Sequence, residues 1–157
     1  MLFCLYKQFS SGEKIEIMSG YEKKSDHKDL FSIARFLAEK GKNVQITTPI
    51  HYKDLYYSVV FGELIGTRYE RKCPDLIIDG TLYEYESYTS PFRREKISNM
   101  LSKGLKQSSR IIINNNKGAS DRYIKRNIHE RLRNFRQHID EVWLYEKGKV
   151  RLLIKEQ

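Results

Sequence analysis

The chain has 157 residues, 39% of them hydrophobic and 31% charged, which suits one folded domain with a buried core. No stretch approaches 18 consecutive apolar residues, and the apolar opening lacks the basic start and cleavage site of a signal peptide, so we expect neither a membrane-spanning helix nor a secretion signal. The net charge is +9, yet residues 1–91 carry 12 basic and 13 acidic side chains whereas residues 92–157 carry 17 and 7, an asymmetry that favours a polyanionic partner, nucleic acid before membrane.

Residues 1–24 allow two interpretations, because "LFCLYKQF" and "KIEIM" are either two strands of a small hairpin or parts of a loose N-terminal arm. Ser25 or Asp26 then caps a helix that runs to about residue 40 and ends at Gly41. "NVQITT" is a short strand, and "HYKDLYYSVVFGELIG" is interpreted as a helix. The apolar residues of that helix are Leu55, Val59 and Ile65.

A second clear helix follows Pro91, from about Phe92 to Ser108, with one apolar face. "RIIIN" is a strand buried on both faces, and Ser120 caps a third helix. The apolar stripe of this third helix consists of Ile124, Ile128, Leu132 and Phe135. The chain closes as "VWLYEKGKVRLLI", two strands around a Lys-Gly turn. We therefore expect one domain of the α/β (α+β) class, with a mixed central sheet flanked by helices.

The stretch "PDLIIDGTLYEYES" gathers four acids of this basic chain on one hairpin. Asp79-Gly80 is a strong two-residue turn signal, and counting outward from it places Asp75 opposite Glu84. Side chains alternate along a strand, so Asp75, Glu84 and Glu86 share one face of the sheet. Like charges directly opposite each other destabilise a sheet. We expect compensation by a divalent cation, by Lys or Arg from a neighbouring element, or by protonation of one acid; an exposed, screened face is the simpler alternative.

This acid, acid-x-acid, helix and apolar-strand order resembles the core of PD-(D/E)xK nucleases. The resemblance implies catalytic or metal-binding roles for Asp75, Glu84 and Glu86. The family usually has Lys at the position of Glu86, and an acid there is a departure from its pattern.

A longer resemblance, from about Glu39 to the C-terminus, is to the C-terminal tRNase domains of bacterial contact-dependent inhibition toxins and their relatives on mobile elements. It rests on "GKNVQ", "CPDLIIDGTLYEYES", "KISNMLSKGLKQSSRIIINN" and "EVWLYEKGKVRLL". It implies a nuclease-like core, RNA cleavage that often needs no metal, a role for Gln107 at the end of its helix, and an immunity or antitoxin protein as partner.

The two resemblances imply different chemistry. A metal nuclease would hold Mg²⁺ on Asp75, Glu84 and Glu86 and activate a water molecule. A metal-free ribonuclease would use the RNA 2′-OH as nucleophile, with Glu84 or Glu86 as base and His129 or His138 as acid. The cofactor is therefore none or Mg²⁺.

The basic helices supply candidate phosphate contacts. Arg122, Arg126, His129, Arg133 and Arg136 recur at helical spacing and form one polar ridge opposite the apolar stripe. The full set of expected nucleic-acid-binding residues is Arg94, Lys103, Lys106, Arg110, Arg122, Arg126 and Arg133. Tyr83 and Tyr85 either stack on bases or belong to the core.

We thus expect a nuclease-like α/β domain over residues 25–157 that acts on RNA. The specific expectation is a tRNA endonuclease of toxin or mobile-element type. A metal-dependent PD-(D/E)xK DNA endonuclease and a non-catalytic nucleic-acid-binding protein remain as alternatives. Cys4 and Cys73 fit no zinc spacing and suit reduced thiols, so we expect a cytoplasmic location. No membrane partner is expected, and the sequence leaves the oligomeric state open.

Overall fold

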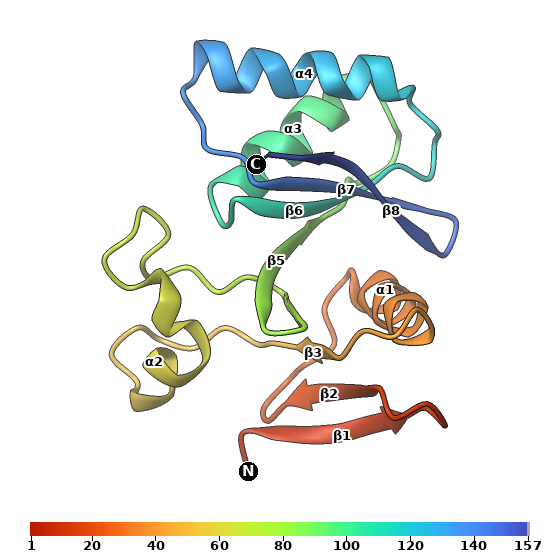
Figure 1. Ribbon diagram of the computed structural model, residues 1–157. Coiled ribbons are helices and arrows are strands. Elements are labelled where there is room, and N and C mark those ends of the chain that lie inside the picture. Colours follow the sequence, from red (N-terminus) through yellow and green to blue (C-terminus); the bar gives the residue numbers. More distant parts are fainter. Residues whose placement is uncertain (157) are drawn as a thin grey trace.

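A computed structural model describes residues 1–156 and shows a single α+β domain built on one mixed sheet of eight strands (Figure 1). The strands lie across the sheet in the order in which they occur in the sequence. They are β1 (Phe3–Gln8), β2 (Lys14–Met18), β3 (Val44–Ile46), β4 (Leu76–Ile78), β5 (Thr81–Glu86), β6 (Arg110–Asn114), β7 (Glu141–Glu146) and β8 (Lys149–Lys155). The helices are α1 (His27–Glu39), α2 (Leu55–Phe61) with the 3₁₀ turn η1 (Gly62–Leu64), α3 (Glu95–Leu105) and α4 (Asp121–Asn134).

Chain connections set the strand directions. Tight turns join β1 to β2, β4 to β5 and β7 to β8, and each of these pairs is antiparallel. Helices α1, α3 and α4 carry the chain between β2 and β3, β5 and β6, and β6 and β7, and those three pairs are parallel. The predicted parallel crossover through the second clear helix is therefore confirmed.

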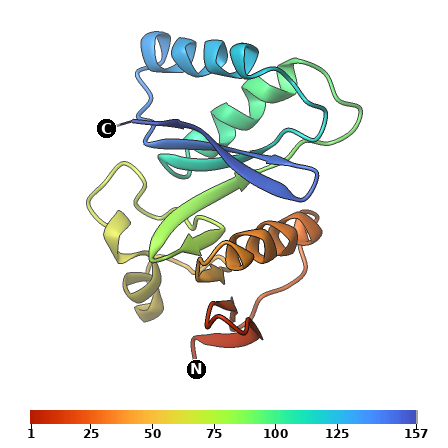
Figure 2. The same cartoon turned by 45° about the vertical axis from the view of Figure 1, so that its right-hand side comes forward.

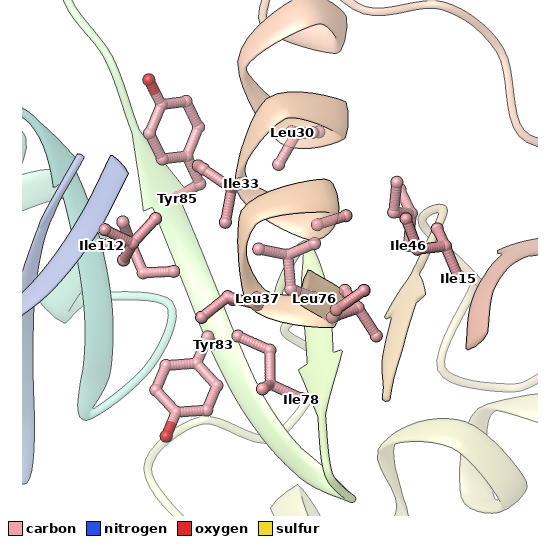
Figure 3. Close-up of a cluster of buried hydrophobic side chains, with 14 of the residues drawn as sticks. Ile15, Leu30, Ile33, Leu37, Ile46, Leu76, Ile78, Tyr83, Tyr85 and Ile112 are labelled. Atoms are coloured by element: carbon pink, nitrogen blue, oxygen red, sulfur yellow. The ribbon is translucent and has the colours of Figure 1, made fainter. Parts of the chain in front are cut away.

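Helix α1 covers one face of the sheet and contacts most of its width. Leu30, Ile33 and Leu37 point into a cluster that includes Tyr83 and Tyr85 of β5 (Figure 3). The same cluster extends from Ile15 on β2 to Val150 on β8. Both tyrosines are buried, so the core interpretation of these residues holds and base stacking on them does not.

The opposite face carries two separate apolar clusters. Helices α3 and α4 pack on β6 and β7 through residues such as Ile111 and Ile113, while α2 and η1 pack on Leu82 of β5. The two turned views agree in showing α3 and α4 beyond β6 and α2 near the opposite end of β5 (Figures 1 and 2). The part of β5 between these two clusters belongs to neither of them.

Two helix faces differ from the sequence prediction. In the segment 51–66 the side chains of Leu55, Val59 and Ile65 are exposed, and Tyr57 and Phe61 are buried instead. The helix is only two turns long, and its aromatic side chains reach the sheet where the aliphatic ones do not. The α4 stripe likewise ends early: the helix stops at Asn134, and Phe135 is 60% exposed.

Other expectations are confirmed. Helix α1 buries the residues that its spacing indicated, and Gly41 follows it at φ +90°. Asp79 and Gly80 form the β4–β5 turn with φ of 47° and 81°, as an Asp-Gly hairpin turn requires. Residues 1–24 contain the hairpin β1–β2, which joins the main sheet because β2 pairs with β3. None of the helices within residues 1–156 is both long and apolar enough to cross a membrane.

A buried carboxylate ties β5, β6 and β7 together. Glu141 is 7% exposed and accepts hydrogen bonds from Arg110 Nε (2.8 Å), Tyr83 Oη (3.1 Å) and Trp143 Nε1 (3.0 Å). Burial raises the pKa of Tyr83, and the Glu141 carboxylate raises it further, so the phenol stays a proton donor. A buried charge with this many donors is compensated, and removing the charge leaves the donors in excess.

We expect Glu141→Gln to lower the free energy of unfolding by about 1–3 kcal/mol, because it replaces charge-assisted hydrogen bonds while keeping the side-chain size. Urea denaturation of the two proteins measures the difference. Glu130→Gln, an exposed position on α4, is the matched control and should change stability by about 0.5 kcal/mol or less. Equal stabilities of the Glu141→Gln and control proteins would contradict this role.

Candidate active site

Strand β5 changes its neighbour halfway along its length. Residues 81–83 pair with β4, and residues 84–86 pair with β6. Strand β4 begins at Leu76, so the edge of β5 that faces it is open beyond Tyr83. A backbone N–H that loses its strand partner in a buried place must find another acceptor.

Asp75 supplies that acceptor. It is 8% exposed, and its Oδ2 accepts the Tyr85 backbone N–H at 3.0 Å. Its other oxygen, Oδ1, lies 3.3 Å from Lys24 Nζ, which comes from the segment before α1. The Asp75 side chain, just before β4, therefore takes the place of the strand as hydrogen-bond partner of β5.

Glu84 is buried directly beside Asp75, as the predicted hairpin register requires. Burial raises the pKa of the Glu84 carboxyl well above its usual value, and the nearby charge of Asp75 raises it further. Its Oε2 is buried and accepts no hydrogen bond from the described residues. Burial and the neighbouring Asp75 thus favour the protonated form of Glu84, which is the third of the three expected forms of compensation.

Glu86 lies on the same sheet face, beneath α3. Its Cγ would be 3.1 Å from a methyl group added at Gly104, so the missing side chain there lets the helix approach the acid. Burial and the charge of Asp75 raise the pKa of Glu86 to about 7, against the lowering effect of Lys103. Glu86 therefore changes charge near neutral pH.

Glu86 lines a hollow of about 340 Å³ between the start of α1 and one side of α3. Asp26 and Asp29 line it from α1, and Lys96, Asn99 and Lys103 from α3. Asp26 stands out because its Oδ1 is buried without a hydrogen-bond partner among residues 1–156. Burial raises the pKa of Asp26, and the charge of Asp75 adds to the effect. The hollow thus combines two carboxyl groups of raised pKa with two lysines.

Asp26 and Lys96 were not among the expected site residues. Asp26 was assigned only as a helix cap, yet its side chain makes no capping hydrogen bond. Its spacing from Asp75 and Glu86 is about 50 and 60 residues, so only the packing of α1 on the sheet brings them together. The charges around "PDLIIDGTLYEYES" therefore do not predict that Asp26 belongs to the site.

The other expected site residues are more dispersed. Lys103 lines the hollow, and Arg94 lies before α3 above the Tyr123 ring at 5.4 Å. Gln107 follows the C-terminal end of α3, with its backbone N–H 2.9 Å from the Gly104 carbonyl oxygen, and does not line the hollow. Lys106 is exposed near it. Arg110 is held by Glu141, so we leave it out of the nucleic-acid surface.

Neither histidine considered as the acid lines the hollow. His129 lies on the exposed side of α4. His138 Nε2 lies 2.9 Å from Asp140 Oδ1, before β7.

The three acids do not fit the expected metal site. In the part of the chain that the structure describes, no group of three or more His, Cys, Asp or Glu side chains is arranged to hold a metal ion. Asp75 already accepts a hydrogen bond from the Tyr85 N–H and pairs with Lys24, and Glu84 is buried with a raised pKa. Hard cations take ionised carboxylates, so we derive no step through Mg²⁺ at these residues.

The structure is thus a single α+β domain on a mixed sheet, with carboxyl groups of raised pKa beside lysines in one hollow. The chain belongs to the family described as the contact-dependent growth inhibition CdiA C-terminal domain, whose model matches residues 72–150, 79 of the 157 residues. This confirms the resemblance to bacterial contact-dependent inhibition toxins. It makes the chain a bacterial, toxin-type domain, and the matched region contains β4–β7, with Asp75, Glu84 and Glu86.

One solved structure has a similar arrangement, described as a CdiA-CT/CdiI toxin and immunity complex from Burkholderia pseudomallei. The two chains are 20% identical, with a TM-score of 0.47 over 88% of this chain and 93% of the other. No curated protein matches the sequence.

The raised pKa of Glu86 has a consequence for stability. A carboxyl whose pKa is higher in the folded than in the unfolded protein stabilises the fold while protonated, and this contribution is lost as pH rises from about 4.5 to 7. Glu86→Gln removes the charge, so this variant should be more stable than the parent at pH 8, by up to about 3 kcal/mol at roughly 1.4 kcal/mol per pKa unit before solvent screening, and the gain should shrink toward pH 4.5.

Thermal unfolding of both proteins across this pH range measures the difference. Glu130→Gln serves again as the control and should show no pH-dependent gain. A Glu86→Gln protein whose stability parallels that of the parent at every pH would show that Glu86 has an ordinary pKa.

Proposed function

We propose that this toxin-type domain cleaves RNA, with tRNA as the substrate, and that Glu86 is the general base. The observation that carries the proposal is Glu86, a carboxyl group with a pKa of about 7 that lines a hollow shared with Lys96 and Lys103. A general base works best when its pKa lies near the operating pH, and cations next to it suit a phosphate.

The proposed reaction needs no group beyond the chain and the RNA. The ionised Glu86 carboxylate accepts the proton of a ribose 2′-OH while the 2′-oxygen forms a bond to the adjacent phosphorus. The bond from phosphorus to the 5′-oxygen breaks, and the ammonium group of Lys96 gives a proton to that leaving oxygen. The products are a 2′,3′-cyclic phosphate and a free 5′-OH. Lys96 and Lys103 offset the negative charge that builds on the phosphate oxygens.

In this proposal Asp75 and Glu84 do not touch the RNA. The charge of Asp75 raises the pKa of both Glu86 and Asp26. Asp75 is in turn fixed by Tyr85 and Lys24. Asp75 and Glu84 are thus positioning and tuning residues here, and Gln107 has no assigned role.

The basic ridge of α4 is the proposed surface for the rest of the RNA. Arg122, Arg126, His129 and Arg133 are exposed along one side of the helix. Ile124 and Ile128 are buried on the opposite side. No ion pair holds Arg122, Arg126 or Arg133 within residues 1–156, so their charges are available to phosphates.

Two further parts of the proposal follow from the family. A domain that cleaves tRNA harms the cell that makes it, so an immunity or antitoxin protein is the proposed partner. The site of action is the cytoplasm, where tRNA is found and where Cys4 and Cys73, both free, stay reduced.

Cleavage by single-site variants tests the chemistry. Glu86→Gln should lower the rate of tRNA cleavage by about 10²–10⁴-fold, because it removes the base and keeps the shape. Glu63→Gln, which changes an exposed acid of η1 away from α4, should cleave like the parent. Because the base must be ionised, the parent rate should rise with pH up to about 7, and Asp75→Asn should move that rise to lower pH. Electrophoresis of labelled tRNA, with EDTA or with Mg²⁺, measures each rate.

The outcomes separate the alternatives. Cleavage of tRNA in EDTA with the predicted loss in Glu86→Gln supports the proposal. Cleavage of plasmid DNA that requires Mg²⁺ would instead favour the metal-dependent DNA endonuclease. Binding without cleavage under any condition would favour a non-catalytic nucleic-acid-binding protein.

Binding to RNA should depend on salt and on the α4 ridge. Each phosphate contact contributes about 0.7 to the slope of log affinity against log salt for single strands and about 0.9 for duplexes. The double variant Arg126→Glu, Arg133→Glu should weaken binding to every RNA sequence alike and reduce this slope by about 1–2. Lys117→Glu with Lys155→Glu, which makes the same charge change elsewhere on the surface, is the control. Fluorescence anisotropy at several salt concentrations gives the slopes, and equal slopes for both double variants would exclude α4 from the interface.

A further inference from the structure

A second hollow lies on the outer side of α1, and its lining is aromatic and basic. Its volume is about 340 Å³, and it is bounded by α1, by Tyr6 of β1 and by Gly148 in the β7–β8 turn. The side chains of Tyr6, His27, Phe31 and Phe36 supply aromatic surface, and those of Lys28 and Arg35 supply charge.

The aromatic side chains form a connected group that reaches solvent. Tyr6 meets Phe31 edge to face with ring centroids 4.8 Å apart, and His27 lies 4.4 Å from Phe31. Tyr21 Oη holds His27 through Nδ1 at 3.0 Å. Tyr6 nevertheless remains 48% exposed, although it is a large apolar ring at the rim of a hollow. A half-exposed ring of this kind is a surface on which a planar ligand stacks.

Most of the charges around the hollow are positive and unpaired. Lys28 and Arg35 are exposed and take part in no ion pair within the described chain. Exposed Lys147 and Lys149 flank Gly148 in the turn that closes one side. Glu39 is the acid that lines the hollow. Aromatic rings beside unpaired cations match a base and its phosphate, the repeating unit of a nucleic acid strand.

The first turn of α1 separates this hollow from the proposed active site. Asp26 and Asp29 line the hollow that contains Glu86, whereas His27 and Lys28, their neighbours in the sequence, line the outer one. Successive residues at the start of a helix point in different directions, so one turn of helix serves both hollows. A strand that crosses this turn reaches both hollows at once.

We propose that the outer hollow is a base-binding subsite for an unpaired nucleotide next to the cleaved bond of the RNA. The base stacks on the rings of Tyr6 and Phe31, and its phosphate contacts Lys28 and Arg35. The position of the subsite next to the cleaved bond rests on the proposed ribonuclease function. Binding of RNA at the subsite does not require cleavage. Base pairing covers the faces of a base within a duplex, so the subsite selects single-stranded segments.

Binding measurements on intact RNA test the subsite. The proteins all carry Glu86→Gln so that the RNA is not cut, and a short single-stranded oligoribonucleotide is compared with a duplex of the same length. Tyr6→Ala should weaken single-strand binding by about tenfold, since stacking on one aromatic ring typically contributes a factor of this order. It should weaken duplex binding less than twofold. Tyr56→Ala, which removes an equally exposed tyrosine on α2, is the matched control and should change neither.

A second pair of variants tests the phosphate contacts. Lys28→Ala with Arg35→Ala should reduce the salt slope for the single strand by about 1.4, at about 0.7 for each contact. Lys117→Ala with Lys155→Ala should leave the slope unchanged. Each protein is first checked by circular dichroism and thermal unfolding, and a variant that fails to fold is replaced by Tyr6→Leu or by Lys28→Gln with Arg35→Gln.

The results separate the subsite from the catalytic proposal. Single-strand binding that is unchanged in Tyr6→Ala, or a loss that is equal for single strand and duplex, overturns the subsite. Cleavage that depends on Glu86 would still support the ribonuclease in that case. Single-strand binding that depends on Tyr6 and Arg35 supports the subsite even when the parent protein, with Glu86 intact, cuts no RNA.

Discussion

The site depends on one backbone constraint, the change of neighbour in the middle of β5. Up to Tyr83 the strand belongs to a hairpin with β4, and from Glu84 on it belongs to a parallel pair with β6. The open edge leaves a buried N–H on Tyr85, and Asp75 binds it. The side chain that accepts this hydrogen bond is a carboxylate, and it lies beside two further acids on the same face of the sheet. The raised pKa of Glu84 and of Glu86 both include a contribution from Asp75.

The three acids lie between two apolar clusters of the sheet and belong to neither of them. The α3–α4 cluster ends at Ile111 and Ile113, and the α2 cluster ends at Leu82. Burying a charged carboxylate without full pairing destabilises a fold, and burial accordingly raises the pKa of Glu84. Strain of this kind is common where a group must react, since the same burial that destabilises the charge also moves the pKa toward neutrality. The Glu141 network shows the other solution, in which a buried carboxylate receives several donors and has no reactive role.

The parts of the fold that local chemistry determines could be predicted, and the rest depends on contacts between distant segments. Asp79-Gly80 determines the hairpin register, and the register places Asp75, Glu84 and Glu86 on one face, so this much followed from spacing alone. Helical spacing likewise identified the buried side of α1 and α3. Asp26 joins the site only because α1 packs across the sheet, and Arg110 is taken up by Glu141 from a strand 31 residues away. On the short helix α2, the exposed Leu55 shows that apolar character alone does not decide which side is buried.

The charge distribution of the chain is explained by the two demands that the proposed reaction makes on one place. A base with a pKa near 7 needs negative neighbours and little water, while a phosphate needs positive ones. Two elements meet these demands separately: the β4–β5 hairpin carries the acids, and α3, which begins the basic half of the sequence, brings Lys96 and Lys103 to the same hollow. Gly104 lets the helix come close to Glu86, and the charge of Lys103 lowers the pKa of that acid. If the proposed reaction takes place here, the acids of this basic protein are gathered where its positive charge begins because a base of neutral pKa and a bound phosphate need opposite charges at the same site.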